Sequence, residues 1–197
     1  MKKLLFLLAM LPLFAKAQFV LTPDGLQTHF ILEIEGKDFI VHEVQNVSKD
    51  ELYKRTKNTL MQIYNSAKEV MTENDGESIS IYATSTKDVY EERNVFGQKT
   101  KWYLTVSYKY NIMFKEGRIR ISAPQVVKAS QYDKDKGTTE FIFGCGTNYA
   151  SGPHYIFKKN GERRSYKYKD TYENFANQLI KLIIDGVSNT EPVVEDW

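Results

Sequence analysis

The sequence has almost no cysteine, little proline and no long apolar run outside its first residues. Of its 197 residues, 1 is cysteine and 5 are proline. One thiol forms no disulfide within the chain and supports no zinc site built on several cysteines. No later apolar run approaches the ~18 residues of a transmembrane helix. Walker loops, G-x-G-x-x-G and G-x-S-x-G motifs are also missing, so the sequence lacks the marks of nucleotide-binding proteins and serine hydrolases.

The residues that are present can form a folded domain. Hydrophobic residues make up 42% of the chain, aromatic residues 13% and charged residues 26%. This composition excludes a disordered or low-complexity protein, because enough apolar surface is available to offset chain entropy. The length indicates a single domain.

The N-terminus has the three parts of a secretory signal in order. Met1-Lys2-Lys3 is basic, residues 4–14 form an apolar run, and Ala15-Lys16-Ala17 is a cleavage pattern. The alternative is a buried N-terminal helix. We predict a signal peptide over 1–17, one domain over 18–187 and a flexible tail over 188–197. The protein is expected to be exported, periplasmic or associated with the cell envelope, and not a lipoprotein, because no cysteine follows the cleavage site.

Removal of the signal changes the net charge. The whole chain has 27 basic and 25 acidic residues, a net charge of +2. Lys2, Lys3 and Lys16 leave with the signal, so the mature chain has 24 basic and 25 acidic residues, a net charge of −1. We therefore expect no nucleic-acid partner, because binding to a phosphate backbone needs a basic surface.

Two helices are predicted from the spacing of apolar residues. The first runs from Ser48, a suitable N-cap, to about Thr72, and Glu51 completes a capping box. Residues at three- and four-residue steps form its apolar stripe: Leu52, Thr56, Leu60, Ile63, Ala67 and Val70. The second helix covers 171–185, with Gly186 at its C′ position.

Alternating apolar and polar residues predict several antiparallel strands. Residues 79–83 form one, and residues 102–114 form the longest, which turns at Glu116-Gly117 into 118–122. Thr22-Pro23-Asp24-Gly25 is a turn signature. Further strands are predicted at 30–34, 39–44, 139–143 and 155–157, with the first two of these joined as a hairpin. Residues 87–100 are polar and are expected to form a loop.

Helices on one face of an antiparallel sheet define an α+β domain. The expected architecture is a curved antiparallel sheet with a long N-terminal helix and a C-terminal helix on one face. We expect the stripe of the first helix to pack on the concave face of the sheet, because both are the largest apolar surfaces on their elements. The expected contact on the sheet is with Trp102, Leu104, Val106 and Tyr108.

Several stretches of the sequence resemble a known family. They include Phe19–Leu26, the helix start Ser48-Lys49-Asp50-Glu51-Leu52-Tyr53, Asn94–Gly97, Tyr103–Val106 and Lys115–Arg120. Together they are similar to an exported bacterial domain of unknown function with a TBP-like fold, over about residues 40–125. The resemblance implies a curved sheet that grips a helix. It implies neither DNA binding nor catalytic residues, because the family has no agreed activity and a fold does not carry a function.

One catalytic hypothesis rests on Cys145. The thiol would be a nucleophile at a strand end, with His154 as its base and an Asp or Asn orienting the ring. The flanking Gly144 and Gly146 would let a substrate carbonyl approach the backbone amides. The alternative is a buried structural thiol beside a turn, and no family-specific motif surrounds the cysteine.

A basic cluster offers a candidate ligand-binding site. It consists of Lys158, Lys159, Arg163, Arg164 and Lys167, with Lys169 nearby. Such a cluster would attract an anionic envelope surface, such as lipopolysaccharide, phospholipid head groups or acidic glycans. The alternative is a charged hairpin that solvates a sheet edge.

Other residues carry weaker indications. His29, His42 and His154 have no metal-binding spacing, and residues 133–137 fail the calcium-loop pattern, so no metal or cofactor is expected. Five tyrosines fall outside the main apolar stripe and either line a contact with a ligand or form cross-strand pairs. They are Tyr103, Tyr132, Tyr149, Tyr155 and Tyr166.

The sequence therefore favours a non-enzymatic binding or interaction module of the cell envelope. Its expected partner is an envelope protein, a glycan or a small ligand. The alternative function is a cysteine-dependent hydrolase that uses Cys145 and His154.

Overall fold

The structure is a computed structural model that describes residues 18–29, 36–93, 99–133, 137–149, 152–164 and 166–188. Within these residues the helices are α1 (Lys49–Ile63), α2 (Ala67–Val70) and α3 (Tyr166–Ser188). The strands are β1 (Gln18–Thr22), β2 (Gly25–His29), β3 (Phe39–Glu43), β4 (Met71–Asn74), β5 (Ser78–Arg93), β6 (Lys99–Lys115), β7 (Arg118–Ser122), β8 (Gln125–Asp133), β9 (Gly137–Cys145) and β10 (His154–Phe157). The predicted signal and the tail from residue 189 lie outside the described residues.

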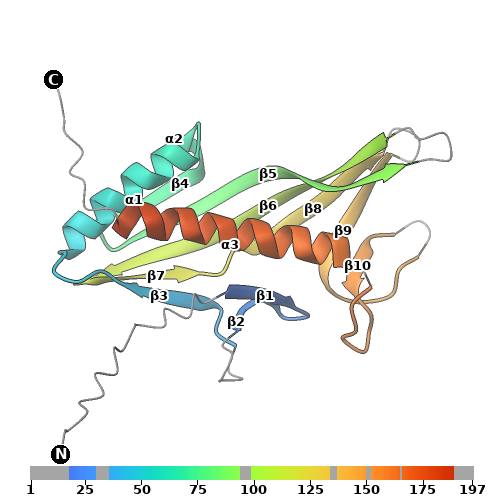
Figure 1. The fold of residues 1–197 in the computed structure, drawn as a ribbon, viewed down its shortest axis with the longest axis horizontal. Coiled ribbons are helices and arrows are strands. Elements are labelled where there is room, and N and C mark those ends of the chain that lie inside the picture. The colour runs from blue at the N-terminus through green and yellow to red at the C-terminus, as the bar shows by residue number, and fades with distance from the viewer. Residues whose placement is uncertain are drawn as a thin grey trace, which may run out of the picture.

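The strands form a separate β1–β2 hairpin and one curved eight-stranded sheet (Figure 1). The sheet runs in the order β10-β9-β8-β6-β5-β4, and β7 joins β3 to β6. Its pairs are antiparallel except for β9 with β10, which is parallel. The α+β architecture is as predicted, but the sheet is mixed, because the chain crosses over between β9 and β10 without a hairpin.

The strand β6 organises the sheet. One edge of β6 pairs with β5, while the other pairs with β8 through Thr105–Lys109 and with β7 through Ile112–Lys115. β7 and β8 thus follow each other along a single edge, interrupted at Ala123 and Pro124. Proline has no backbone N–H and restricts the residue before it, which explains the interruption.

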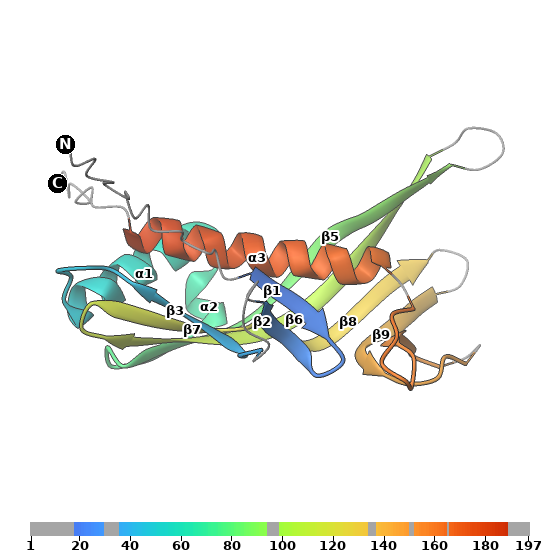
Figure 2. The same ribbon diagram turned by 60° about the horizontal axis from the view of Figure 1, so that its bottom comes forward.

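One face of the sheet is buried beneath the helices. In β6 the buried residues alternate as predicted, and they are Leu104, Val106, Tyr108, Tyr110, Ile112 and Phe114. α3 lies along this inner face (Figure 2). Phe175 of α3 packs edge-on against Tyr108, with ring centroids 4.9 Å apart. The side chain of Trp102 is outside the described part of the structure.

The predicted partner of the N-terminal helix was wrong in detail. α3 covers Leu104 and Val106 through Tyr172 and its neighbours. α1 packs farther along the same face, where Tyr53 contacts Phe114 with ring centroids 5.3 Å apart. The C-terminal helix, which has 23 residues, takes the central position, and α1 has 15.

α1 begins where the capping pattern predicts and ends earlier than its apolar stripe predicts. Ser48 Oγ accepts a hydrogen bond from Glu51 N at 3.2 Å. The helix stops at Ile63, because Tyr64 is extended and its hydroxyl contacts those of Tyr108 and Tyr110 at 3.2 and 3.0 Å. Burial raises the pKa of all three tyrosines, so they remain protonated. The rest of the predicted helix forms α2 and the edge strand β4.

The polar stretch over 87–100 is not the predicted loop. β5 continues to Arg93 and β6 begins at Lys99, and the register places Glu91 opposite Lys101. Polar residues suit a two-stranded ribbon outside the core, since neither face must be buried. Figure 2 shows this ribbon extending past the N-terminal end of α3.

Gly186 lies inside α3 and not at a C′ position as predicted. A Cβ at Gly186 would lie 2.3 Å from Thr59 Oγ1 of α1, so the missing side chain lets the two helices approach closely. The same end of α3 is held by Arg55, whose Nη1 donates to Val187 O at 3.3 Å. A cation at the carbonyl end of a helix complements the helix dipole.

The predicted turn over 22–25 joins β1 to β2, and the φ of +111° at Gly25 favours glycine there. Side chains of α3 hold this hairpin in place. Asn177 accepts a hydrogen bond from Phe19 N at 2.8 Å and donates one to Phe19 O at 2.9 Å. Glu173 accepts one from the backbone N–H of Leu21.

The second predicted hairpin is not found as such. Its first strand, over 30–34, lies outside the described residues. Its second strand is β3, which pairs with β7 from Phe39 opposite Ser122 to Glu43 opposite Arg118.

Candidate functional site

The structure does not bring Cys145 and His154 together. Cys145 is exposed at the end of β9, so the expectation of a buried thiol was wrong. His154 begins β10 opposite Phe141, and the two rings meet edge-on at 5.7 Å. Four strand positions separate Phe141 from Cys145, about 13 Å at 3.3 Å per residue.

Gly146 has a structural role beside Cys145. A Cβ at this position would lie 2.4 Å from the ring of Tyr155, so the glycine makes room for that ring. Its N–H donates to Phe157 O at 3.2 Å, and its carbonyl accepts from Arg164 Nη2 at 2.8 Å. Because this N–H already donates to Phe157, it is not free to bind an oxyanion. A hydrolase would need a free N–H for that purpose.

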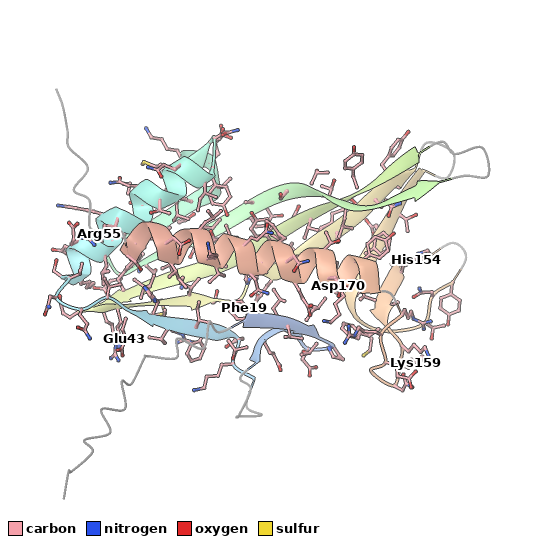
Figure 3. The ribbon with its side chains drawn as sticks, in the orientation of Figure 1. Phe19, Glu43, Arg55, His154, Lys159 and Asp170 are labelled. Carbon is pink, nitrogen blue, oxygen red and sulfur yellow. The ribbon has the colours of Figure 1, made fainter. Side chains whose placement is uncertain are left out.

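The predicted basic residues lie on the turn after β10. Figure 3 shows Lys159 at this end of the molecule, exposed to solvent. Lys158 pairs with Glu162 at 2.7 Å and thereby lowers the pKa of that carboxyl. Arg164 donates to the carbonyl of Gly146, and Arg163 also has an interaction partner. The side chain of Lys167 lies outside the described residues.

Lys169 is not part of the exposed cluster. Its side chain is buried, at 3% exposure, and pairs with Glu173 one turn farther along α3. Glu173 also binds the backbone of β1, so this buried pair supports the docking of the N-terminal hairpin. Its role is structural.

The predicted surface tyrosines are mostly exposed. Tyr103, Tyr132 and Tyr149 are 47%, 72% and 68% exposed, whereas Tyr155 packs over Gly146. The side chain of Tyr166 is not described. Among the described residues no group of histidine, cysteine, aspartate and glutamate could hold a metal ion, and no helix there is long and apolar enough to span a membrane.

The feature that stands out is an open strand edge in the middle of the sheet. β3 pairs with the β7 part of the β7–β8 edge as far as Ser122, and β9 pairs with β8 from Ala129 onward. Between them, over Pro124–Lys128, no described strand pairs with this edge. β8 has a register irregularity between Lys128 and Val126, and such bulges bend a strand away from its neighbour.

A groove of about 470 Å³ lies along this edge, and we call it the edge groove. Its walls come from the β1–β2 hairpin, from β8 and from β9. The lining residues are Leu21, Pro23–Leu26, Asp38, Ala123–Lys128, Phe141–Phe143 and Tyr172. Its volume falls within the roughly 300–1,000 Å³ of typical ligand pockets.

The inner wall of the edge groove is firmly held. The hydroxyl of Tyr172 donates to Pro124 O at 2.9 Å, and its ring contacts Phe143 edge-on at 5.0 Å. Burial raises the pKa of Tyr172, so the hydroxyl remains a donor. The opposite wall is the turn of the hairpin, which α3 fixes through Asn177 and Glu173.

The charged residues that line the edge groove are mainly acidic. Asp24 and Asp38 are both exposed at its rim. Lys128 also lines the groove, but its ammonium lies 3.7 Å from the carboxylate of Glu140. The groove therefore combines an apolar interior with a negative rim.

Sequence reasoning missed the edge groove entirely. No motif marks it, and its strand β8 was not predicted. The only sequence signal was Pro124, which separates β7 from β8 and so allows each strand its own register with β6. The divergence of β8 from β9 depends on pairing between residues far apart in the chain, which periodicity does not reveal.

Comparisons with known proteins show which family part of the chain is similar to. Residues 40–127 match the model of a domain of unknown function (DUF4468) with a TBP-like fold. These residues are therefore similar to the DUF4468 family. The match runs from β3 to Val127 in the edge groove, so β9 and the N-terminal hairpin lie outside it. A comparison with curated proteins finds no match.

Solved structures confirm the fold over a larger part of the chain than the DUF4468 match. A TBP-like protein from Parabacteroides distasonis has a TM-score of 0.54 and 16% identity, covering 78% of this chain and 92% of that one. A DUF4468 family protein from Bacteroides ovatus has a TM-score of 0.54 and 11% identity, covering 84% of this chain and 90% of that one. At this identity the likeness establishes the TBP-like fold and carries no function.

Proposed function

We propose that this protein is an exported, non-enzymatic binding module of the cell envelope whose ligand lies in the edge groove. The observation that carries the proposal is the groove itself, whose lining combines apolar side chains with polar groups. This combination is typical of binding sites. The export part of the proposal rests on the basic start, apolar run and cleavage pattern at the N-terminus.

The arrangement of the groove supports binding more than catalysis. Its lining holds no described cysteine or histidine, and Cys145 and His154 stand apart from each other on β9 and β10. The basic turn after β10 is the weaker candidate for a ligand site, since three of its four described cations are engaged within the protein. We therefore place the ligand at the groove.

Site-specific photo-crosslinking in cells tests this function. The crosslinker p-benzoylphenylalanine would replace Gln125, which lines the groove, and in a matched strain Lys109, which lies opposite Gln125 in the β6–β8 register but outside the groove. We expect adducts in the envelope fraction from position 125 and not from position 109. Equal adducts from both positions, or none from position 125, would contradict the proposal.

A further inference from the structure

We propose that the ligand of the edge groove is an extended peptide segment with a basic residue, which adds to the sheet as a strand along Pro124–Lys128. This inference rests on the proposed function and names its ligand class. A small amphiphile is the other occupant that the test below can reveal.

The first argument is the main chain of the edge. A strand with an unpaired side presents N–H and C=O groups, and an extended peptide satisfies them by pairing. Pro124 has no N–H, and its carbonyl already accepts from Tyr172, so the groups available for pairing come from the residues that follow it. In the described structure this side of Pro124–Lys128 faces no strand, although the same strand is paired on its other side with β6. β3 and β9 flank the open stretch, so a short inserted segment would complete the row between them.

The second argument is the shape of the site. A fully exposed strand edge can pair with the edge of any other sheet. The open edge at Pro124–Lys128 instead lies beside the β1–β2 turn, which forms one wall of the groove. The open stretch of five residues is about 17 Å long, so it has room for about five residues of an extended chain. A single extended segment needs less room there than the edge of a second folded sheet.

The third argument is the alternation of side chains on an added strand. Successive side chains of a strand point to opposite faces of the sheet. One set would meet the apolar interior formed by Leu21, Leu26 and Phe143, and the other would face solvent. The groove therefore favours a ligand in which apolar and polar residues alternate.

The fourth argument is charge. Asp24 and Asp38 lie on the rim of the groove, and the cation of Lys128 is matched by Glu140. An acidic rim attracts a lysine or arginine in the ligand, and salt weakens this attraction.

The test measures the binding of defined peptides to the purified full-length protein by calorimetry. The first probe is a six-residue peptide that alternates valine with threonine and has one central lysine. The second is the same peptide methylated on alternate backbone nitrogens, and the third has glutamate in place of lysine. We expect the first to bind, N-methylation to weaken binding at least tenfold because donors are lost, and glutamate to weaken binding severalfold at low salt.

A pair of variants localises the binding. Gln125→Trp would place a large side chain at the wall of the groove and should abolish binding of the first peptide. Lys109→Trp adds the same side chain opposite Gln125 but outside the groove, and it should leave binding unchanged. Equal loss in both variants, with both folded as judged by circular dichroism, would overturn the assignment to the groove.

A non-peptide probe separates this inference from the proposed function. The amphiphilic dye 8-anilinonaphthalene-1-sulfonate reports occupation of the apolar interior by its fluorescence. If the dye binds the wild type but not Gln125→Trp, and no peptide binds, the groove is a binding site and the peptide inference is wrong. If the methylated and unmethylated peptides bind equally, strand addition is wrong. If neither dye nor peptide binds, both proposals are wrong.

Discussion

Two regions of the sheet are covered in different ways. Where α1 crosses α3, the helices approach closely enough that Gly186 tolerates no side chain, and the inner face is filled by Leu52 and Leu60. Nearer the middle of the molecule the cover is the β1–β2 hairpin, held by hydrogen bonds to Asn177 and Glu173. Figure 3 marks the first region by Arg55 and the second by Phe19.

The difference separates stability from binding. A closely packed helix crossing leaves no space for a ligand, and it contributes most of its free energy through buried apolar surface. A hairpin held by a few polar contacts leaves a groove beneath it, and such contacts contribute about 1 kcal/mol each. We therefore expect substitutions at the helix crossing to change global stability, and substitutions at the hairpin to change the local opening of the groove.

The largest expected effect is at Leu60, which is fully buried in α1. Leu60→Ala should lower the free energy of unfolding by roughly 2–5 kcal/mol, because it leaves a cavity in a packed core. Chemical denaturation measures this loss. Leu182→Ala on the exposed side of α3 is the matched control and should cost less than about 0.5 kcal/mol. A similar small loss at Leu60 would mean that the helix crossing is not the more stable of the two regions.

The next effect concerns the close contact between the helices. Gly→Ala inside a helix normally stabilises by about 0.5–1 kcal/mol. Gly186→Ala should instead destabilise by about 1–3 kcal/mol, because the new Cβ would lie 2.3 Å from Thr59 Oγ1. The double variant with Thr59→Ala should recover part of the loss in a denaturation cycle. An increase in stability for Gly186→Ala alone would contradict the close approach.

At the hairpin, Asn177→Ala removes both hydrogen bonds to the backbone of Phe19. We expect a loss of about 1–2 kcal/mol that appears mainly as faster hydrogen exchange in β1 and β2. Hydrogen exchange read by mass spectrometry distinguishes this local opening from global unfolding. The control is Asn174→Ala on the exposed side of the same helix. Uniformly faster exchange over the whole sheet would show that the hairpin is part of the main core.

The smallest effect is a pH dependence at the end of α3. Burial lowers the pKa of His42 below 6.5 despite the nearby Asp185, and its Nε2 contacts Ser188 Oγ at 2.8 Å. The unfolded chain therefore binds more protons, so the contribution is complete above pH 6.5 and is lost as the pH falls through the lower folded pKa. Wild type should lose less than about 1 kcal/mol relative to His42→Gln between pH 8 and pH 5.5, because the ring is partly exposed. Chemical denaturation of both proteins at the two pH values measures this difference. The same change in unfolding free energy for wild type and His42→Gln would contradict the prediction.

Local patterns predicted the parts of the fold that depend on local chemistry. The cap at Ser48, the turn at Gly117 and the buried alternation along β6 were all confirmed, because each depends on neighbouring residues. The α+β class followed from the same patterns, whereas the TBP-like fold was implied by the resemblance of several stretches to a known family.

The remaining features depend on distant residues. The helix ends at Ile63 because Tyr64 reaches two tyrosines of β6, and Gly186 is required by Thr59 of another helix. The candidate site was missed for the same reason, since an open edge exists only relative to the strands that flank it. The residues singled out by chemical type, Cys145 and His154, turned out to stand apart.

The anchoring of the hairpin by α3 also sets the order in which the chain can fold. Phe19 and Asn177 are separated by 158 positions. At synthesis rates of about 5–20 residues per second, the anchor emerges roughly 8–30 s after the strand that it holds. The first strand of the domain must therefore wait for the last helix, and the groove between them is completed only at the end of folding.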